Sequence, residues 1–77
     1  MQLDIITPDK NLYSGEASEL VVPASTGLLG ILENHAPLIS SLMKGSIKIT
    51  TSKGIENFDV NGGVIEVLNN KVIILAE

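Results

Sequence analysis

His35 is the single histidine of the chain and the first residue to consider for chemistry. A metal site needs several Cys, His or carboxylate ligands, and only Glu33 stands beside it in the sequence. A general base needs a nucleophile held within hydrogen-bond distance, and no pattern brings Ser40 or Ser41 to that position. We therefore expect a structural or interface role for His35, with no catalytic residue, no metal site and no cofactor.

Lys44 offers a second chemistry, because it follows Met43 in an expected turn. Small acidic β-sandwich carrier domains of the biotinyl and lipoyl type attach their cofactor to a hairpin lysine, which in the biotinyl type has a methionine before it. Here Ser41 and Leu42 stand where those domains have acidic and alanine neighbours. A carrier domain modified on Lys44 is the alternative function, and a solvated turn lysine is the simpler interpretation.

Gly27 and Gly30 flank two leucines in a segment bounded by two prolines. A nucleotide-binding loop would continue with lysine and a hydroxyl residue and would open a helix, and neither signal follows here. A turn built for solubility would carry Asp, Asn or Ser where Leu28 and Leu29 stand. The leucines either fold back into a core or are displayed to a partner.

Composition limits the possible function classes. The 77 residues make one expected domain, residues 1–77, with a thin core and no cysteine to staple it, which suits a subunit of a larger assembly. Nine acidic residues against five lysines, with no arginine, argue against nucleic-acid binding. The glutamates are spaced in no way that selects a catalytic pair.

The sequence also shows no signal peptide and no segment long enough to be a membrane helix. The N-terminus lacks the basic and apolar regions of a signal peptide. The longest apolar run, residues 72–76, is far shorter than the roughly 20 residues of a membrane helix. We expect a soluble cytoplasmic protein with no direct membrane insertion, which meets a membrane only through a partner.

The secondary-structure pattern is all-β. Ile47 and Ile49 alternate with polar residues, which is typical of a half-buried strand, and Asn69-Asn70 predicts a tight hairpin turn. Gly15 is expected to mark a bend or bulge, Pro23 to close its strand, and the apolar run 72–75 to be buried on both faces. About eight to ten short strands in a flattened sandwich or barrel are predicted, with no C-terminal helical domain. Extended segments are expected at residues 1–7, 12–22, 30–32, 37–43, 46–51, 55–61, 64–68 and 71–76.

Several sequence blocks, in order along the whole chain, carry a family resemblance. They are Leu3-Asp4-Ile5-Ile6-Thr7-Pro8, Tyr13-Ser14-Gly15-Glu16, Val22-Pro23, Gly27, Gly30-Ile31-Leu32, His35-Ala36-Pro37-Leu38-Ile39 with Leu42 and Gly45, Gly62-Gly63-Val64-Ile65-Glu66-Val67 and Asn70-Lys71-Val72. In these blocks the chain resembles the N-terminal β-sandwich domain of the ε subunit of F-type ATP synthases, which is called δ in mitochondria.

The resemblance implies a non-catalytic central-stalk subunit. Such a domain joins the γ subunit to the ring of c subunits, turns with them and couples proton transport to ATP synthesis, peripheral on the cytoplasmic face of the bacterial inner membrane. It implies γ contacts for Thr7, Ser40 and Leu42. It also implies a ring-facing turn from Gly27 through Leu28 and Leu29 to Gly30, with His35 placed near the same end.

Two departures from the family pattern stand out. Leu28 occupies a position that is often acidic in members, which suits an apolar contact better than a polar one. The sequence ends at Glu77, just after the last expected strand, whereas longer members continue into an inhibitory helical hairpin. The expectation is a short form, without that hairpin.

Overall fold

Nine β-strands and no helix make up the chain, of which a computed structural model describes residues 1–77. The all-β prediction is confirmed. The strands are β1 (Gln2–Ile6), β2 (Asn11–Glu16), β3 (Glu19–Ala24), β4 (Gly27–Leu32), β5 (Leu38–Leu42), β6 (Gly45–Thr51), β7 (Gly54–Val60), β8 (Gly63–Leu68) and β9 (Lys71–Ala76).

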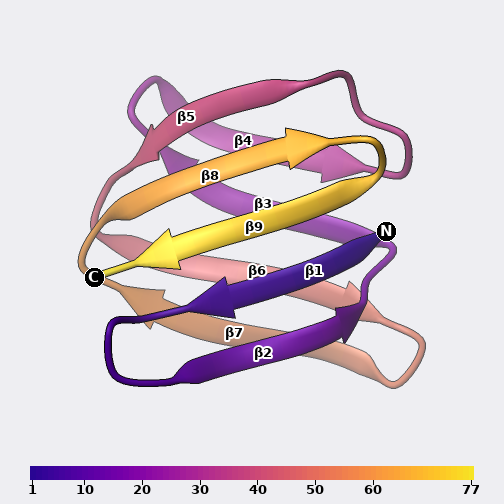
Figure 1. The fold of residues 1–77 in the computed structure, drawn as a ribbon, viewed down its shortest axis with the longest axis horizontal. Helices are drawn as coiled ribbons and strands as arrows, with labels where there is room; N and C mark the ends of the chain where they lie inside the picture. Colours follow the sequence, from indigo (N-terminus) through magenta and orange to yellow (C-terminus); the bar gives the residue numbers. More distant parts are fainter.

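The strands form one continuous sheet that folds over into two layers (Figure 1). Its order is β2-β1-β9-β8-β5-β3-β6-β7, and β4 pairs with the remaining edge of β3. The front layer holds β2, β1, β9, β8 and β5, and the rear layer holds β4, β3, β6 and β7. A single residue pair, Ala24 with Leu42, joins β3 to β5 where the sheet passes between layers. Only β1 and β9 pair in parallel.

The core lies between the layers and is filled by alternate side chains of the strands. Leu3 and Ile5 of β1, and Ile47 and Ile49 of β6, are fully buried. This confirms the alternation predicted from the sequence, because successive residues of a strand point to opposite faces.

Two turns behave as their residues predict. Asn69 and Asn70 have φ values of 52° and 58° in the hairpin between β8 and β9. Both angles are left-handed, and asparagine tolerates them better than most residues. Gly62 and Gly63, where the chain passes from β7 into β8, have φ values of 145° and 140°, which favour glycine.

Two boundary predictions are wrong. Pro23 lies within β3, opposite Leu28 of β4, and its carbonyl oxygen accepts a hydrogen bond from the Met43 N–H at 2.7 Å. That oxygen points away from β4, so the position needs no N–H toward β4 and proline is tolerated. Gly15 lies in regular register opposite Leu3, without a bend or bulge. The extended segment is interrupted instead after Glu16, where β2 ends.

The prediction for the apolar run 72–75 is also wrong in part. Val72 and Ile74 are fully buried, but Ile73 is half-buried and Leu75 is 55% exposed. An apolar run in a strand is compatible with burial on both faces, or with one buried face and one apolar face at the surface. The second arrangement holds for β9.

Candidate partner-binding surfaces

The outer side of the front layer carries a group of exposed apolar side chains. Leu75 of β9 is the residue opposite Val64 of β8 on one side and Ile6 of β1 on the other. Ile73 lies opposite Glu66. We call this group the outer apolar face; it consists of Ile6, Ile39, Val64, Leu68, Ile73 and Leu75.

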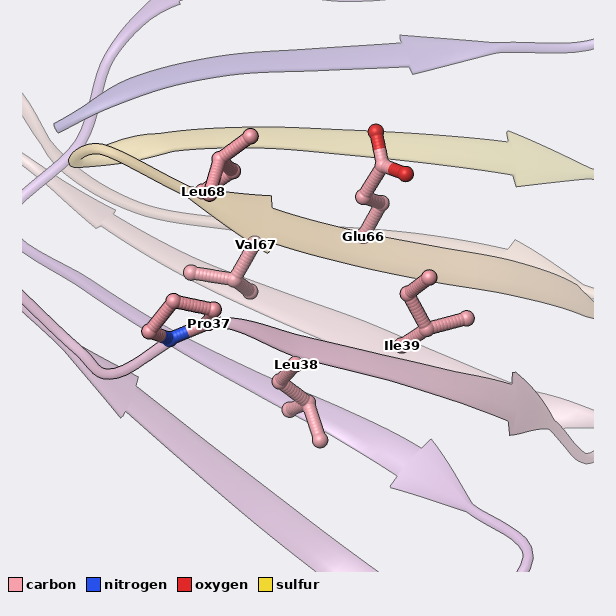
Figure 2. Close-up of a pocket in the computed structure, with 6 residues that line it drawn as sticks. All are labelled: Pro37, Leu38, Ile39, Glu66, Val67 and Leu68. Atoms are coloured by element: carbon pink, nitrogen blue, oxygen red, sulfur yellow. The ribbon is translucent and has the colours of Figure 1, made fainter.

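A shallow hollow of about 370 Å³ lies at one end of this face (Figure 2). Ile39 of β5 stands opposite Glu66 of β8 in the register, and Pro37 and Leu68 lie at the same margin. Ile39 is 71% exposed, which is high for an isoleucine in a strand paired along its length. A second hollow, of about 400 Å³, lies at the other end of the face. An exposed, hollowed apolar face with a carboxylate, Glu66, beside its members is typical of a binding surface.

The three residues predicted to contact γ occupy different environments. Thr7 borders the second hollow, and its hydroxyl exchanges hydrogen bonds of 3.1 Å with the backbone of Lys10. Ser40 is half-buried and lies opposite the buried Ile65. Leu42 is 5% exposed and belongs to the core. Thr7 is thus the one of the three beside the outer apolar face, whereas Ser40 and Leu42 point inward from β5.

The sequence interpretation missed Ile39, Leu68 and Leu75 as surface residues. A signal was available, because β8 has apolar residues at both its inward and its outward positions. The run 72–75 carried the same signal, but we assigned it to complete burial.

The predicted ring-facing segment lies in β4 rather than in a protruding loop, and the turn before it is Ser25 and Thr26. Gly27 has a φ of 124°, whereas Gly30 has no such angle. Leu28 is 79% exposed, and Leu29 is partly buried against the core. Leu28 is therefore displayed at the surface, where a partner could contact it, whereas Leu29 folds back onto the core.

His35 does not lie near Gly27, and the prediction that placed it at the same end is wrong. β4 begins at Gly27 and runs the length of the rear layer to Leu32, and His35 follows in the next loop (Figure 1). Its backbone N–H donates to the Leu32 carbonyl at 3.3 Å, and its ring Nδ1 lies 2.7 Å from the Ala36 carbonyl oxygen. The loop between β4 and β5, which contains the half-buried His35, lies at the opposite end of the sandwich from the turn between β3 and β4 (Figure 1).

The loop that carries His35 is fastened to the N-terminus. The Met1 ammonium donates to the Ala17 carbonyl at 2.9 Å and to the Glu33 carboxylate. The N–H of Asn34 donates to Asn70 Oδ1 at 2.8 Å. The hydrogen bond from the Met1 ammonium, and its charge, lower the pKa of Glu33 below the usual range, against the opposing effect of desolvation. These contacts serve to hold three chain segments together.

Lys44 is exposed between β5 and β6, and Met43 before it is 55% exposed. No element of the chain is a helix long and apolar enough to cross a membrane.

Residues 1–77 match the family described as ATP synthase, Delta/Epsilon chain, beta-sandwich domain. The chain belongs to this family. The curated ε chain of Leptospira borgpetersenii is 46% identical over 77 residues, which are 100% of this chain and 61% of that protein. The ε chain of Chlorobium limicola is 40% identical over 77 residues, 99% of this chain and 88% of that protein.

Solved structures of ATP synthases share the fold of this delta/epsilon family member. The central stalk and c-ring structure of the Tetrahymena thermophila mitochondrial enzyme contains a chain with a TM-score of 0.82 and 21% identity, over 97% of this chain and 61% of that one. A chain of the Euglena gracilis mitochondrial enzyme has a TM-score of 0.89 and 18% identity, over 96% of this chain and 48% of that one. The family assignment leaves the carrier alternative on Lys44 without support.

Proposed function

We propose that this chain is a non-catalytic rotor subunit in the central stalk of an F-type ATP synthase. It joins the γ subunit to the c-ring and so helps to couple proton transport to ATP synthesis. The chain spans about three-fifths of the Leptospira relative that it matches, so the proposal concerns the β-sandwich part of the subunit. The observation that carries it is the outer apolar face, in a chain of the delta/epsilon family.

The outer apolar face is the surface that fits γ. A permanent subunit interface has an apolar centre and a polar rim, and burying apolar surface provides the main driving force for association. Leu75 and Val64 give the face its centre, Thr7 lies at its margin, and Glu66 supplies a carboxylate among them. In this arrangement Ser40 and Leu42 support β5 from inside, and Ile39 makes the contact from the same strand.

The exposed turn before β4 is the part that fits the c-ring. Leu28 projects into solvent beside Gly27, and the turn lies at one end of the sandwich (Figure 1). A ring whose loops present some apolar surface would cover Leu28. His35 lies at the far end, so its contact is with another part of the stalk.

The subunit would be peripheral to the membrane, held there by the ring. In a bacterial cell this position is the cytoplasmic face of the inner membrane.

Binding to a catalytic complex of α, β and γ subunits tests the proposal, by co-elution and by calorimetry. We expect one copy to bind per γ, and Leu75→Asp to weaken binding by about tenfold or more, because a charge is placed in the centre of an apolar interface. Ile55→Asp is the matched control, because Ile55 is 58% exposed against 55% for Leu75 and lies on β7 of the rear layer. It should bind as the unaltered chain does.

Absence of binding at micromolar concentrations would contradict the γ assignment. Equal losses in Leu75→Asp and Ile55→Asp would mean that the outer apolar face is not the interface. Intact mass of the purified chain addresses the carrier alternative, since a covalent group on Lys44 would exclude the rotor function.

A further inference from the structure

The strand β4 has one free edge. It pairs only with β3, through six residue pairs from Glu19–Leu32 to Ala24–Gly27. It forms the outer margin of the rear layer (Figure 1).

The hydrogen-bonding pattern shows which backbone groups this edge presents. Pro23 has no N–H, and its carbonyl oxygen is bonded to Met43 on the side away from β4, so Pro23 and Leu28 form a non-hydrogen-bonded pair. Such pairs alternate with hydrogen-bonded pairs in an antiparallel ladder. The N–H and C=O groups of Leu28, Gly30 and Leu32 therefore point away from β3, toward the free edge. The Leu32 carbonyl also accepts a hydrogen bond from the His35 N–H.

This edge lacks the features that normally prevent pairing with another chain. Every residue of β4 is Gly, Leu or Ile, so the strand has no charge, no proline and no polar side chain. The other two edge strands differ. β7 carries Glu56 and Asp59, and Phe58 of β7 packs edge-to-face on Tyr13 of β2 with ring centroids 6.1 Å apart.

Gly30 is not required by the fold of the single chain. Its φ is not left-handed, and a Cβ added there would meet no atom within 4 Å. Leu28 and Leu32 on either side of it are 79% and 60% exposed, on the same face of the strand. Leu28 and Leu32 lie two residues before and two residues after Gly30, so a two-fold axis at Gly30 would place each leucine of one copy opposite a leucine of the other.

We propose that the free edge of β4 pairs antiparallel with the same edge of a second copy of this chain, with Gly30 opposite Gly30 at the two-fold axis. Leu28 of each copy then lies opposite Leu32 of the other. Each facing pair exchanges N–H···O bonds, so the dimer gains about six of them. The rear layers of the two copies become one continuous sheet.

Charge restricts where two copies can meet. Each copy carries a net charge of −4, which opposes their association, so a contact between copies is least unfavourable on a strand without charged residues. Pairing through β4 brings only uncharged side chains face to face. The contact is small, well below the roughly 1,200 Å² of a stable interface, and therefore makes a weak dimer that depends on concentration. It also covers Leu28, so the dimer and the proposed attachment to the c-ring exclude each other.

The test is sedimentation equilibrium of the untagged chain over about 10 µM to 1 mM. Gly30→Glu should raise the dissociation constant of the dimer about fivefold, because it sets two like charges directly opposite each other. Gly30→Lys should do the same. An equimolar mixture of the two variants should regain dimer, since opposite charges then face each other. Gly30→Ala is the control at the same site, and it should dimerise as the unaltered chain does.

A chain that stays monomeric at 1 mM overturns the proposal, as does a Gly30→Glu variant that dimerises normally. A mixture no better than its two components also overturns it, because the axis would not pass through Gly30. If the chain stays monomeric and Gly30→Glu weakens binding to the complex with γ, the edge belongs to another subunit and not to a second copy. Binding of γ through the outer apolar face is measured separately by Leu75→Asp, so the two proposals can fail independently.

Discussion

Gly63 should be the glycine that this fold can least replace. It begins β8 with a φ of +140°, which L side chains rarely adopt. A Cβ at Gly63 would lie 2.2 Å from the Leu75 carbonyl oxygen and 3.0 Å from the Ala76 Cα, both in the backbone of β9. Gly63 is also paired with Leu42 on its other side, so β8 cannot move away without breaking that contact.

The cost of Gly63→Ala follows from these two constraints. The unfavourable φ costs about 1–3 kcal/mol for a residue with a Cβ. Relieving the clash means separating the ends of β8 and β9, and each lost hydrogen bond adds about 1 kcal/mol. We expect a total of about 3–5 kcal/mol. A chain of this length has a free energy of unfolding of about 4–12 kcal/mol, so the variant loses a large fraction of it.

Urea unfolding followed by far-UV circular dichroism measures the effect. With a slope of about 1 kcal/mol per molar urea, the Gly63→Ala midpoint should fall by about 3–5 M, or the variant should be unfolded without urea. Gly30→Ala is the matched control, because its Cβ meets nothing and its φ is ordinary, and it should stay within about 0.5 kcal/mol of the unaltered chain. Equal midpoints for Gly63→Ala and the unaltered chain would refute this account of the β8–β9 contact.

Two further predictions concern the ends of the sandwich. Leu28→Asp should keep its far-UV spectrum, because the side chain is 79% exposed, and should lower affinity for a c-ring with bound γ by about tenfold. Leu32→Asp at the other end of β4 should bind the ring normally, and loss of secondary structure in Leu28→Asp would show that Leu28 is part of the core. The folded-state pKa of Glu33 is lowered by the Met1 ammonium, so this contact stabilises the fold above the ordinary pKa of a glutamate and is lost as the pH falls through the lowered value. Thermal melts of Glu33→Gln should therefore show less loss of stability on acidification than those of the unaltered chain or of Glu66→Gln, and parallel pH curves for all three would disprove the role of Glu33.

Most of the strand pattern could be predicted from the sequence because it depends on local alternation. Ile47 and Ile49 are buried in β6 as expected, and Asn69 and Asn70 adopt the left-handed angles of their turn. The errors arose where the pairing partner decided the outcome. Pro23 stays inside β3 because its backbone nitrogen and carbonyl face away from β4, so the ladder with β4 needs no N–H there, and nothing in the local sequence indicates this.

The family and its candidate surfaces were predictable to different degrees. Short residue blocks in a fixed order suffice to indicate the delta/epsilon family, because together they are spread along the whole length of the chain. The direction in which each side chain points depends on register and layer. Leu28 and Leu29 are neighbours of the same type, yet one is exposed and the other packs on the core, since they lie on opposite faces of β4.

The sequence alone therefore determines that this chain is an all-β member of a known family with neither the cysteine nor the arginine that other functions need. Only the tertiary structure decides that Ile39, Val64 and Leu75 form one face, because they come from three strands brought together by register. It also separates His35 from Gly27. His35 is only eight positions after Gly27 in the sequence, but the strand β4 lies between them and extends by about 3.3 Å per residue, so closeness in sequence does not become closeness in space.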